Sequence, residues 1–445
     1  MLELSGKRVI VVGLGVSGIA AVRLCLSRGA VVTATDSRPL SELSDEIRSL
    51  PVTVCAGGHE GVAFDIADLI VVSPGVPPLA QLQQAESQGV PVIGELDLGA
   101  RFVEAPLIAV GGTNGKSTVT TLLAQMFAQV EDRVFSGGNL GTPLAQAAQG
   151  KWDLMVVEVS SFQLERAPCF HPRVALLLNI TEDHLDRYPD FAAYAEAKGN
   201  AFLLQEAGDF AVIPLGDRLC EQQARRGLGQ ILTFGTGGDY AHEGRSVIER
   251  STGERFSFEE SRLFGEHNAL NVAACVAAAW ALGLSKIAIE SALQQFVPLP
   301  HRMAYVGEIA GVRFYDDSKG TNVGASVSAL QGLQEARGVL IAGGRDKLGD
   351  YAPLAQALAK KGRAVVVLGE AANRIAAATQ EVLPTLQVRD LEQAVRVAFE
   401  QAVSGDAVLL SPACASFDMF KSYADRGEQF VAAVHRLQGV KGRLA

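Results

Sequence analysis

The sequence lacks the features of an exported or membrane protein. Its six cysteines lie far apart, at positions 25, 55, 169, 220, 275 and 414, without a C-x-x-C pair. Neither a zinc site nor a disulfide framework is therefore indicated. The opening MLELSGKRVIVVGLG has no basic segment and no cleavage site of a secretion signal, and no apolar run reaches the roughly 18 residues that a membrane span needs. We expect a cytoplasmic protein with no membrane partner.

An excess of positive charge is missing as well. Lys and Arg number 39 against 49 Asp and Glu, and the net charge of −10 is not that of a general nucleic-acid binder. Anionic small molecules are not excluded, because they respond to local groups. With 48% hydrophobic and 20% charged residues, the 445-residue chain is globular but too long for one core, and its length suggests about three domains. We expect a monomer that takes small-molecule substrates and no nucleic acid.

The stretch LIAVGGTNGKSTVTT at 107–121 points to a phosphorylated substrate. An apolar, strand-like run ends in a glycine-rich turn, followed by Lys116, Ser117 and a segment with helical spacing. Glycines let N–H groups converge on phosphate oxygens, the helix directs its positive end at them, Lys116 adds a cation, and Ser117 can hold Mg²⁺. Val110 stands where G-x-x-x-x-G-K-[ST] has its first glycine, so we expect a tighter loop. The alternative is a strand-to-helix turn without a ligand.

The first hundred residues open like a Rossmann unit. A buried strand at 7–13 leads into GLGVSG at 13–18, and a second strand at 30–35 ends at Asp36. Two interpretations stay open. Either Asp36 and Ser37 lie near the ribose or base of a nucleotide, or the glycines only permit close packing of helix on strand.

Single polar residues further along the chain each allow two interpretations. Glu158 ends the apolar run LMVVEV and either helps to hold Mg²⁺ or is a solvated strand end. His184 is either structural or a metal-edge group, and Lys198, in a helical pattern, is a solvated cation unless a site surrounds it. Asn268 and Asn271, one helical turn apart, either bind a base or cap the helix.

The sequence predicts an α/β fold of three domains: a Rossmann-like N-terminal domain at 1–94, a central P-loop-type ATPase domain at 95–299 and a Rossmann-like C-terminal domain at 300–445. Within the central domain, FSGGNLG reads as a turn-rich segment, and AVIP, QILTFG and GERFSF suggest an antiparallel edge or hairpin. In the third domain, polar segments follow the strands, where a second substrate would bind.

Taken together, these segments resemble the Mur ligase family, the ATP-dependent amide ligases of peptidoglycan precursor synthesis. The motifs that carry the resemblance run in order through all three domains: GGTNGKST, GGNLGTP, EVSSFQLE, NITEDHLDRY, FGEHNALN, LPHRM, DDSKGTN, GGRDK and SPACASFDMFKSYADRGEQF. DDSKGTN and SPACASFD, with the Rossmann-like start, are similar to the branch that adds D-glutamate.

The resemblance implies a reaction and its cofactors. ATP would phosphorylate the carboxylate of UDP-N-acetylmuramoyl-L-alanine, and the amine of D-glutamate would displace phosphate from the acyl phosphate. Phosphoryl transfer to a carboxylate builds charge on several oxygens, so clustered cations and N–H donors suit it. ATP and Mg²⁺, with two metal sites, are the implied cofactors.

The resemblance also implies roles for single residues. Lys116 would contact the β- and γ-phosphates, Ser117 and Glu158 would hold one Mg²⁺, His184 would belong to a second Mg²⁺ site, and Lys198 matches a lysine that such ligases carbamylate. A carbamate would turn that side chain into an anionic ligand. The implied catalytic residues are Lys116, Glu158, His184 and Lys198.

The implied binding residues fall into three sets. The set for ATP is Gly112, Thr113, Asn114, Gly115, Lys116, Ser117, Thr118, Asn268, Asn271, Arg302 and Asp317. The set for the UDP substrate is Asp36, Ser37, Arg38, Ser73, Gly75, Asn139 and Ser160. The set for D-glutamate is Lys319, Thr321, Lys347, Ser416 and Tyr423, where cations and hydroxyls suit two carboxylates. The chain departs from the family at Gly111, commonly Thr, and at Tyr423, often Phe.

Other classes of function compete with the ligase. A nicotinamide-dependent oxidoreductase would use the first domain but leaves the phosphate loop and third domain unexplained. A P-loop switch or regulatory ATPase would use hydrolysis to change shape. Within the ligases, a sister Mur enzyme or a folylpolyglutamate-type ligase is the nearest alternative.

Overall fold

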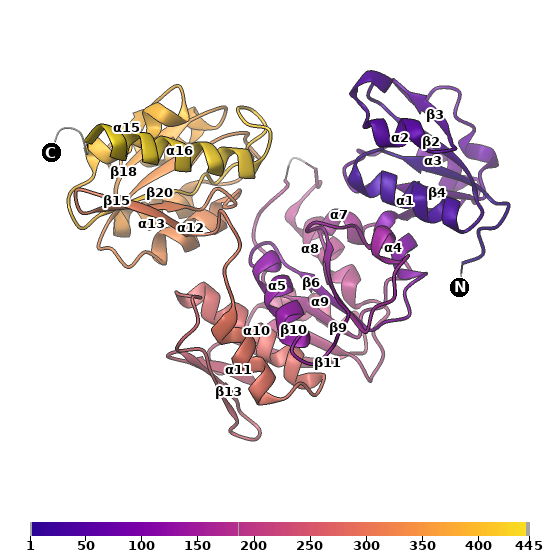
Figure 1. Ribbon diagram of the computed structural model, residues 1–445, viewed down its shortest axis with the longest axis horizontal. Coiled ribbons are helices and arrows are strands. Elements are labelled where there is room, and N and C mark those ends of the chain that lie inside the picture. Colours follow the sequence, from indigo (N-terminus) through magenta and orange to yellow (C-terminus); the bar gives the residue numbers. More distant parts are fainter. Residues whose placement is uncertain (1, 186, 442–445) are drawn as a thin grey trace. The chain divides into compact units, whose positions relative to one another are not determined.

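The structure, a computed structural model, describes residues 2–185 and 187–441 (Figure 1). The chain divides into two compact units. The first comprises Met1–Ile180, Tyr194–Glu260 and Leu270–Gln295, and the second comprises Thr181–Ala193, Ser261–Ala269 and Phe296–Ala445. Within the described ranges, no helix combines the length and apolar character that crossing a membrane requires.

The first unit begins with a five-stranded parallel sheet in the order β3-β2-β1-β4-β5. Its strands are β1 (Arg8–Val12), β2 (Val31–Asp36), β3 (Thr53–Ala56), β4 (Leu69–Val72) and β5 (Val92–Gly94). Its helices are α1 (Val16–Ser27), α2 (Asp45–Ser49) and α3 (Ala80–Ser87), with short 3-10 turns η1 (Leu40–Glu42) and η2 (Phe64–Ile66). Alternate residues of β1 enter two hydrophobic clusters, Val11 in one and Ile10 in the other. Because both faces are covered, β1 reads as a continuous apolar run.

The same unit holds a nine-stranded sheet in the order β14-β13-β12-β11-β10-β9-β6-β8-β7. The strands are β6 (Leu107–Gly111), β7 (Val134–Gly138), β8 (Leu154–Glu158), β9 (Val174–Leu177), β10 (Phe210–Pro214), β11 (Gln230–Phe234), β12 (Tyr240–Glu243), β13 (Ser246–Glu249) and β14 (Arg255–Ser257). The helices that follow the first sheet are α4 (Glu95–Ala100), α5 (Lys116–Phe127), α6 (Leu144–Ala147), α7 (Ser161–Leu164), α8 (Phe191–Gly199), η3 (Asn200–Phe202), α9 (Arg218–Ala224), α10 (Glu266–Ala281) and α11 (Lys286–Gln295).

Two details of this sheet differ from the sequence prediction. The antiparallel edge is correct for β12, β13 and β14 but wrong for β10 and β11, which pair parallel with each other. The other neighbour of β10, β9, is also parallel to it. Strand direction depends on the partner that a strand meets, which a short apolar run does not encode. The prediction that FSGGNLG forms turns is also partly wrong, because its first four residues belong to the edge strand β7. The last residue of that strand, Gly138, has φ of 97°.

The second unit holds a six-stranded sheet in the order β15-β16-β20-β17-β18-β19, in which only the β15–β16 pair is antiparallel. The strands are β15 (Ala304–Ile309), β16 (Val312–Asp316), β17 (Gly338–Gly343), β18 (Gly362–Leu368), β19 (Thr385–Gln387) and β20 (Ala407–Leu410). The helices are α12 (Val323–Gln331), α13 (Ala352–Lys361), α14 (Ala372–Thr379), α15 (Leu391–Gln401) and α16 (Tyr423–Lys441).

Helices cover both faces of this six-stranded sheet. Ile341 of β17 packs in one hydrophobic cluster with residues of α15 and α16, and Leu340 packs in the other with residues of α12, α13 and α14. The predicted α/β fold is confirmed. The predicted domain boundaries after residues 94 and 299 stay predictions.

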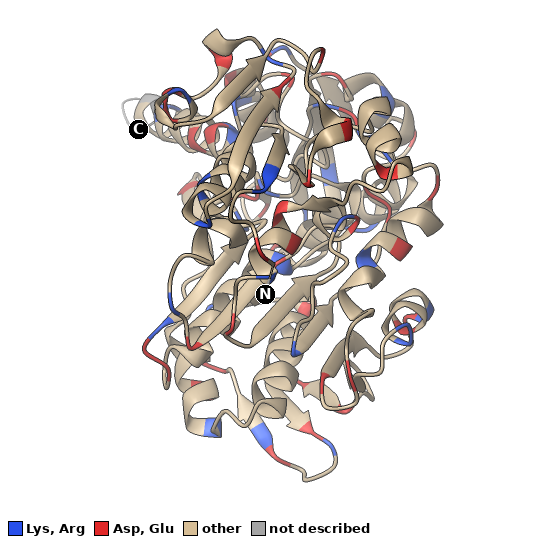
Figure 2. Cartoon of the chain, turned by 90° about the vertical axis from the view of Figure 1, so that its right-hand side faces the viewer, with Lys and Arg blue, Asp and Glu red and all other residues tan. Residues whose placement is uncertain are grey.

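Figure 2 shows acidic and basic residues interspersed along the ribbon. Many of them form local ion pairs, for example Arg133 with Asp153 and Arg225 with Glu221. These exposed pairs contribute little to stability, because water and salt screen them.

Candidate active site

The phosphate loop follows β6, the strand between β8 and β9 in the nine-stranded sheet. The chain leaves β6 at Gly111, turns through 112–115 and begins α5 at Lys116. Gly112 and Gly115 take φ of 134° and 88°, which side-chain-bearing residues rarely adopt. A Cβ on Gly115 would also lie 2.5 Å from Oδ1 of Asn271. The loop therefore requires glycine for both its conformation and its close approach to α10.

Two lysine side chains donate hydrogen bonds to carbonyl oxygens of this loop. Lys116 Nζ donates to the carbonyl oxygens of Gly112, at 3.0 Å, and Thr113, at 2.7 Å. Lys198 Nζ, on α8, donates to the same Gly112 oxygen at 2.8 Å and lies 4.5 Å from the ring centroid of Tyr194. Lys198 is only 4% exposed, so its interpretation as a solvated cation is wrong. Two cations are thus held against a loop suited to anions.

Glu158 ends β8 as a buried carboxylate, so its interpretation as a solvated strand end is wrong. Its Oε1 accepts a 2.6 Å hydrogen bond from Nδ2 of Asn139, and its backbone oxygen accepts one from the Asn139 N–H. Its Oε2 is buried without a hydrogen-bond partner among the described residues. A buried, half-satisfied carboxylate is unfavourable unless a cation or donor joins it.

The residues predicted for the UDP substrate at the first sheet gather at the carboxyl ends of β2 and β4. Asp36 accepts hydrogen bonds from the Leu14 N–H, at 2.7 Å, and from the Arg38 guanidinium, at 2.8 and 3.0 Å. Burial alone would raise the pKa of Asp36, but these hydrogen bonds outweigh it and lower the pKa to about 2. Ser73 Oγ donates to the Gly13 oxygen at 2.7 Å, while Ser37, Arg38 and Gly75 are exposed. Strand order reverses between β1 and β4, and open α/β sheets bind ligands at such a point.

The glycines at 13–18 permit close packing of α1 on the loop. A Cβ on Gly18 would lie 1.8 Å from the Gly13 oxygen, so α1 packs on the loop only with glycine there. The remaining substrate candidate, Ser160, accepts from the Gln163 N–H in a capping box at the start of α7.

In the second unit, three polar segments follow β16, β17 and β20, adjacent parallel strands whose carboxyl ends share one edge of the sheet. Lys347, after β17, donates from Nζ to Oδ1 of Asp183 at 2.9 Å. Asn322 donates from Nδ2 to the other oxygen of Asp183 at 3.2 Å. Burial raises the pKa of Asp183, but the charge of Lys347 leads the effects that hold it below its ordinary value. Asp183 is absent from the predicted site residues. The one sequence feature that could have indicated it is its place beside His184 in the motif NITEDHLDRY.

Other predicted residues of this unit have defined partners. Lys319 Nζ lies 3.9 Å from the ring centroid of Tyr423, so the aromatic wall binds a cation through its face. Asp317 is buried and accepts from Ser411 Oγ at 2.7 Å, and burial raises its pKa to about 7. Asn268 donates from Nδ2 to the Phe264 oxygen at 2.8 Å.

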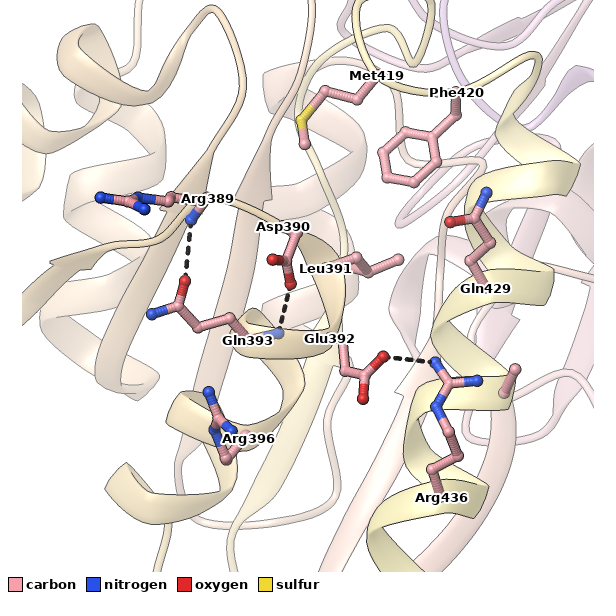
Figure 3. A pocket seen from close by; sticks show the side chains of 11 residues that line it. Arg389, Asp390, Leu391, Glu392, Gln393, Arg396, Met419, Phe420, Gln429 and Arg436 are labelled. Carbon is pink, nitrogen blue, oxygen red and sulfur yellow. Dashed lines mark hydrogen bonds and ion pairs between the residues drawn. The ribbon is translucent and has the colours of Figure 1, made fainter.

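The described residues contain no cluster of three or more His, Cys, Asp or Glu side chains placed to hold a metal. A groove between the start of α15 and α16, lined in part by Arg389, Arg396 and Met419, contains none of the predicted site residues (Figure 3). Within it, Arg436 pairs with Glu392 at 3.0 Å.

Comparison with known proteins covers all three parts of the chain. Residues 7–94 match the Mur ligase MurD-like N-terminal domain, residues 110–279 the Mur ligase middle domain, and residues 301–414 the Mur ligase glutamate ligase domain. The UDP-N-acetylmuramoylalanine–D-glutamate ligase of Syntrophotalea carbinolica is 44% identical, over 99% of this chain and 100% of the relative. The ligase of that name from Desulfosudis oleivorans is also 44% identical, over 98% of each chain.

Solved structures share the fold at lower identity. The UDP-N-acetylmuramate–alanine ligase of Thermotoga maritima is 19% identical with a TM-score of 0.61, over 98% of this chain and 100% of that one. A folylpolyglutamate synthase of Mycobacterium tuberculosis, complexed with ADP and AMPPCP, is 17% identical with a TM-score of 0.61, over 75% of this chain and 92% of that one.

Proposed function

This chain belongs to the Mur ligase family, and we propose that it joins D-glutamate to UDP-N-acetylmuramoyl-L-alanine through an acyl phosphate. It is an ATP-dependent ligase of peptidoglycan precursor synthesis. The observation that carries this conclusion is the full-length match to relatives with that one activity in their name. The family resemblance and the three-domain architecture are confirmed. The oxidoreductase and the P-loop switch leave two of the three matched domains unexplained.

In the proposed reaction, the phosphate loop binds the triphosphate of ATP. Lys116 turns from the Gly112 and Thr113 oxygens to the β- and γ-phosphates, while N–H groups at the start of α5 donate to their oxygens. Once Lys116 has turned, these donors are in place as charge builds on the transferred phosphoryl group. The Thr113 and Asn114 N–H groups already donate to Asn179 and so fix the loop. Asn268, Asn271, Arg302 and Asp317 complete the proposed nucleotide set.

The buried Oε2 of Glu158, which meets no hydrogen-bond partner in the part of the chain that the structure describes, supports a magnesium site. We propose that Ser117 and Glu158 hold one Mg²⁺, with Asn139 fixing the other oxygen of Glu158. When bound, Mg²⁺ neutralises phosphate charge and polarises the transferred group. His184 and Lys198 form the proposed second site. Carbamylation of Lys198 would leave its nitrogen one hydrogen for the Gly112 oxygen and add two anionic oxygens.

The two remaining substrates have separate proposed sites. Asp36, Ser37, Arg38, Ser73, Gly75, Asn139 and Ser160 bind the UDP substrate. Lys319, Thr321, Lys347, Ser416 and Tyr423 bind D-glutamate, with the two lysines matched to its two carboxylates. Asp183, missed from the sequence, orients Lys347 through their 2.9 Å ion pair. We propose that the enzyme works in the cytoplasm as a monomer, which light scattering of the purified protein would check.

The test is phosphate release from ATP with substrates omitted one at a time. We expect release only when UDP-N-acetylmuramoyl-L-alanine and D-glutamate are both present. A panel of D- and L-amino acids, and a folate acceptor, separates the alternatives. Turnover with ATP alone, or equal rates with L-glutamate or another amino acid, would contradict the proposed function.

A further inference from the structure

We infer that Arg374 is a positioning residue for the amino-acid substrate, because it fixes the loop that carries Lys347. The inference rests on the proposed role of Lys347 in binding D-glutamate. Arg374 lies on α14, outside every motif that the sequence singled out. The loop is residues 344–349, which follow β17.

The Arg374 guanidinium contacts the loop on both sides of Lys347. Its Nη1 forms an ion pair with Oδ2 of Asp346, the residue before Lys347. Its Nη2 donates to the Gly349 oxygen at 3.0 Å. Its flat face lies 5.3 Å from the ring centroid of Tyr351. A planar fork with several donors suits this bridging better than an ammonium would.

Asp346 connects Arg374 to the backbone of the loop through hydrogen bonds. Its Oδ1 accepts hydrogen bonds from the Leu348 N–H, at 2.9 Å, and from the Tyr351 hydroxyl, at 3.1 Å. Leu348 takes φ of 60°, a conformation that a residue with a side chain keeps only when its surroundings enforce it. Burial raises the pKa of Asp346, but Arg374 and the Leu348 N–H outweigh it, so the carboxyl is ionised at neutral pH. The backbone on either side of Lys347 is thus fixed through one carboxylate.

The same network reaches the loop that carries Ser416. The Tyr351 hydroxyl lies 3.2 Å from Sγ of Cys414. The Arg345 N–H donates to the Ala415 oxygen at 2.9 Å, which joins the two loops through their backbones. Arg374, Asp346 and Tyr351 therefore connect the two segments that are proposed to bind D-glutamate and fix their relative position.

The test is the steady-state kinetics of Arg374→Ala. We expect the KM for D-glutamate to rise about tenfold, because a binding group held loosely loses affinity, while kcat and the KM for ATP change less than about twofold. Arg374→Lys should give an intermediate KM, since it keeps the charge and loses the fork. Adding Asp346→Asn to Arg374→Ala should raise the KM little further, because both act through one interaction. The matched control is Arg436→Ala, which breaks an exposed ion pair of the same unit.

The variant Lys347→Ala distinguishes an error in the role of Arg374 from an error in the role of Lys347. If it raises the KM for D-glutamate and Arg374→Ala does not, the inference is wrong and the proposed function stands. If neither variant raises that KM, the assignment of Lys347 is wrong. If Arg374→Ala lowers the melting temperature and changes all KM values alike, its role is structural and the inference is overturned.

Discussion

The phosphate loop and the amino-acid loops are built by different means. At the phosphate loop, glycine conformations and backbone carbonyls set the geometry, and the residues from Gly112 to Lys116 are consecutive. The loop after β17 also needs glycines, with φ of 127° at Gly343 and 134° at Gly344, but side-chain pairs with distant residues add to its geometry. Lys347, for example, meets Asp183 across 164 residues of sequence. A backbone site is therefore readable in a short motif, whereas a side-chain site depends on how the chain folds.

Both sites also contain lysine or arginine side chains with defined partners. Two lysines converge on the Gly112 oxygen, and Lys198 also lies against the Tyr194 ring. In the second unit, Lys347 and Arg374 are each held by a carboxylate. We therefore expect substitutions at the phosphate loop to abolish chemistry and substitutions at the amino-acid loops to weaken binding.

Lys116→Ala should have the largest effect. Without the ammonium, charge developing on the transferred phosphoryl group loses its closest side-chain cation, so we expect phosphate release to fall about 10³-fold or more. Release is measured with all three substrates at saturation. Lys151→Ala, an exposed lysine of the same unit, is the control and should be unaffected. If Lys116→Ala lost only affinity for D-glutamate, the expected difference between the phosphate loop and the amino-acid loops would be contradicted.

Lys198→Ala should come next, with a loss of about 10²-fold. Added short-chain carboxylates should restore part of the activity, because they supply the anionic oxygens that a carbamate on Lys198 would provide. The measurement is phosphate release against carboxylate concentration. Near-wild-type activity without any carboxylate would remove Lys198 from the site.

Lys347→Ala should act on binding more than on chemistry. Its loss leaves the buried Asp183 carboxylate without its cation and removes a charge from the substrate site, so we expect the KM for D-glutamate to rise about 10²-fold. Saturating D-glutamate should restore most of kcat. Asp183→Asn should raise the same KM less, about tenfold, because Lys347 remains but is not oriented. A drop in kcat that substrate cannot overcome would contradict the distinction between the two sites.

The last prediction concerns stability and pH and lies outside both sites. Glu95 of the first unit is buried, with one oxygen accepting from the Ala145 N–H at 2.7 Å and the other without a hydrogen-bond partner in the described part of the chain. Burial raises its pKa to about 7, against the Ala145 and Leu144 N–H groups, which lower it. The unfolded value is about 4.3, so the folded state binds more protons between these values. Stability therefore falls as the pH rises through this window, by up to about 4 kcal/mol, and is constant above it.

Glu95→Gln tests this pH dependence. The midpoint of urea unfolding, followed between pH 5 and pH 8, should lose much of its slope in the variant and keep it in Glu104→Gln, an exposed control. An unchanged slope in Glu95→Gln would show that another group titrates. No comparable loss is expected from Asp183, whose carboxyl is paired with Lys347 and has a lowered pKa.

The sequence predicts the backbone-built features well and the side-chain-built features poorly. Continuous apolar runs locate β1, β6 and β8, because strands covered on both faces are apolar throughout. The direction of β10 and β11, the burial of Lys198 and the role of Asp183 are not predicted. Each depends on a partner far along the chain, such as Gly112 for Lys198, 86 residues away. Arg374 has no motif at all, and only its contacts with Asp346 and Gly349 reveal it.

The central claim is that ATP activates a carboxylate as an acyl phosphate before the amide bond forms. The most direct measurement uses UDP-N-acetylmuramoyl-L-alanine labelled with ¹⁸O in its carboxylate, together with unlabelled ATP, D-glutamate and water. Attack of the amine on the carbonyl carbon expels phosphate with the bridging oxygen, so the account predicts one ¹⁸O atom in each phosphate released. Unlabelled phosphate at the same rate of turnover would contradict it.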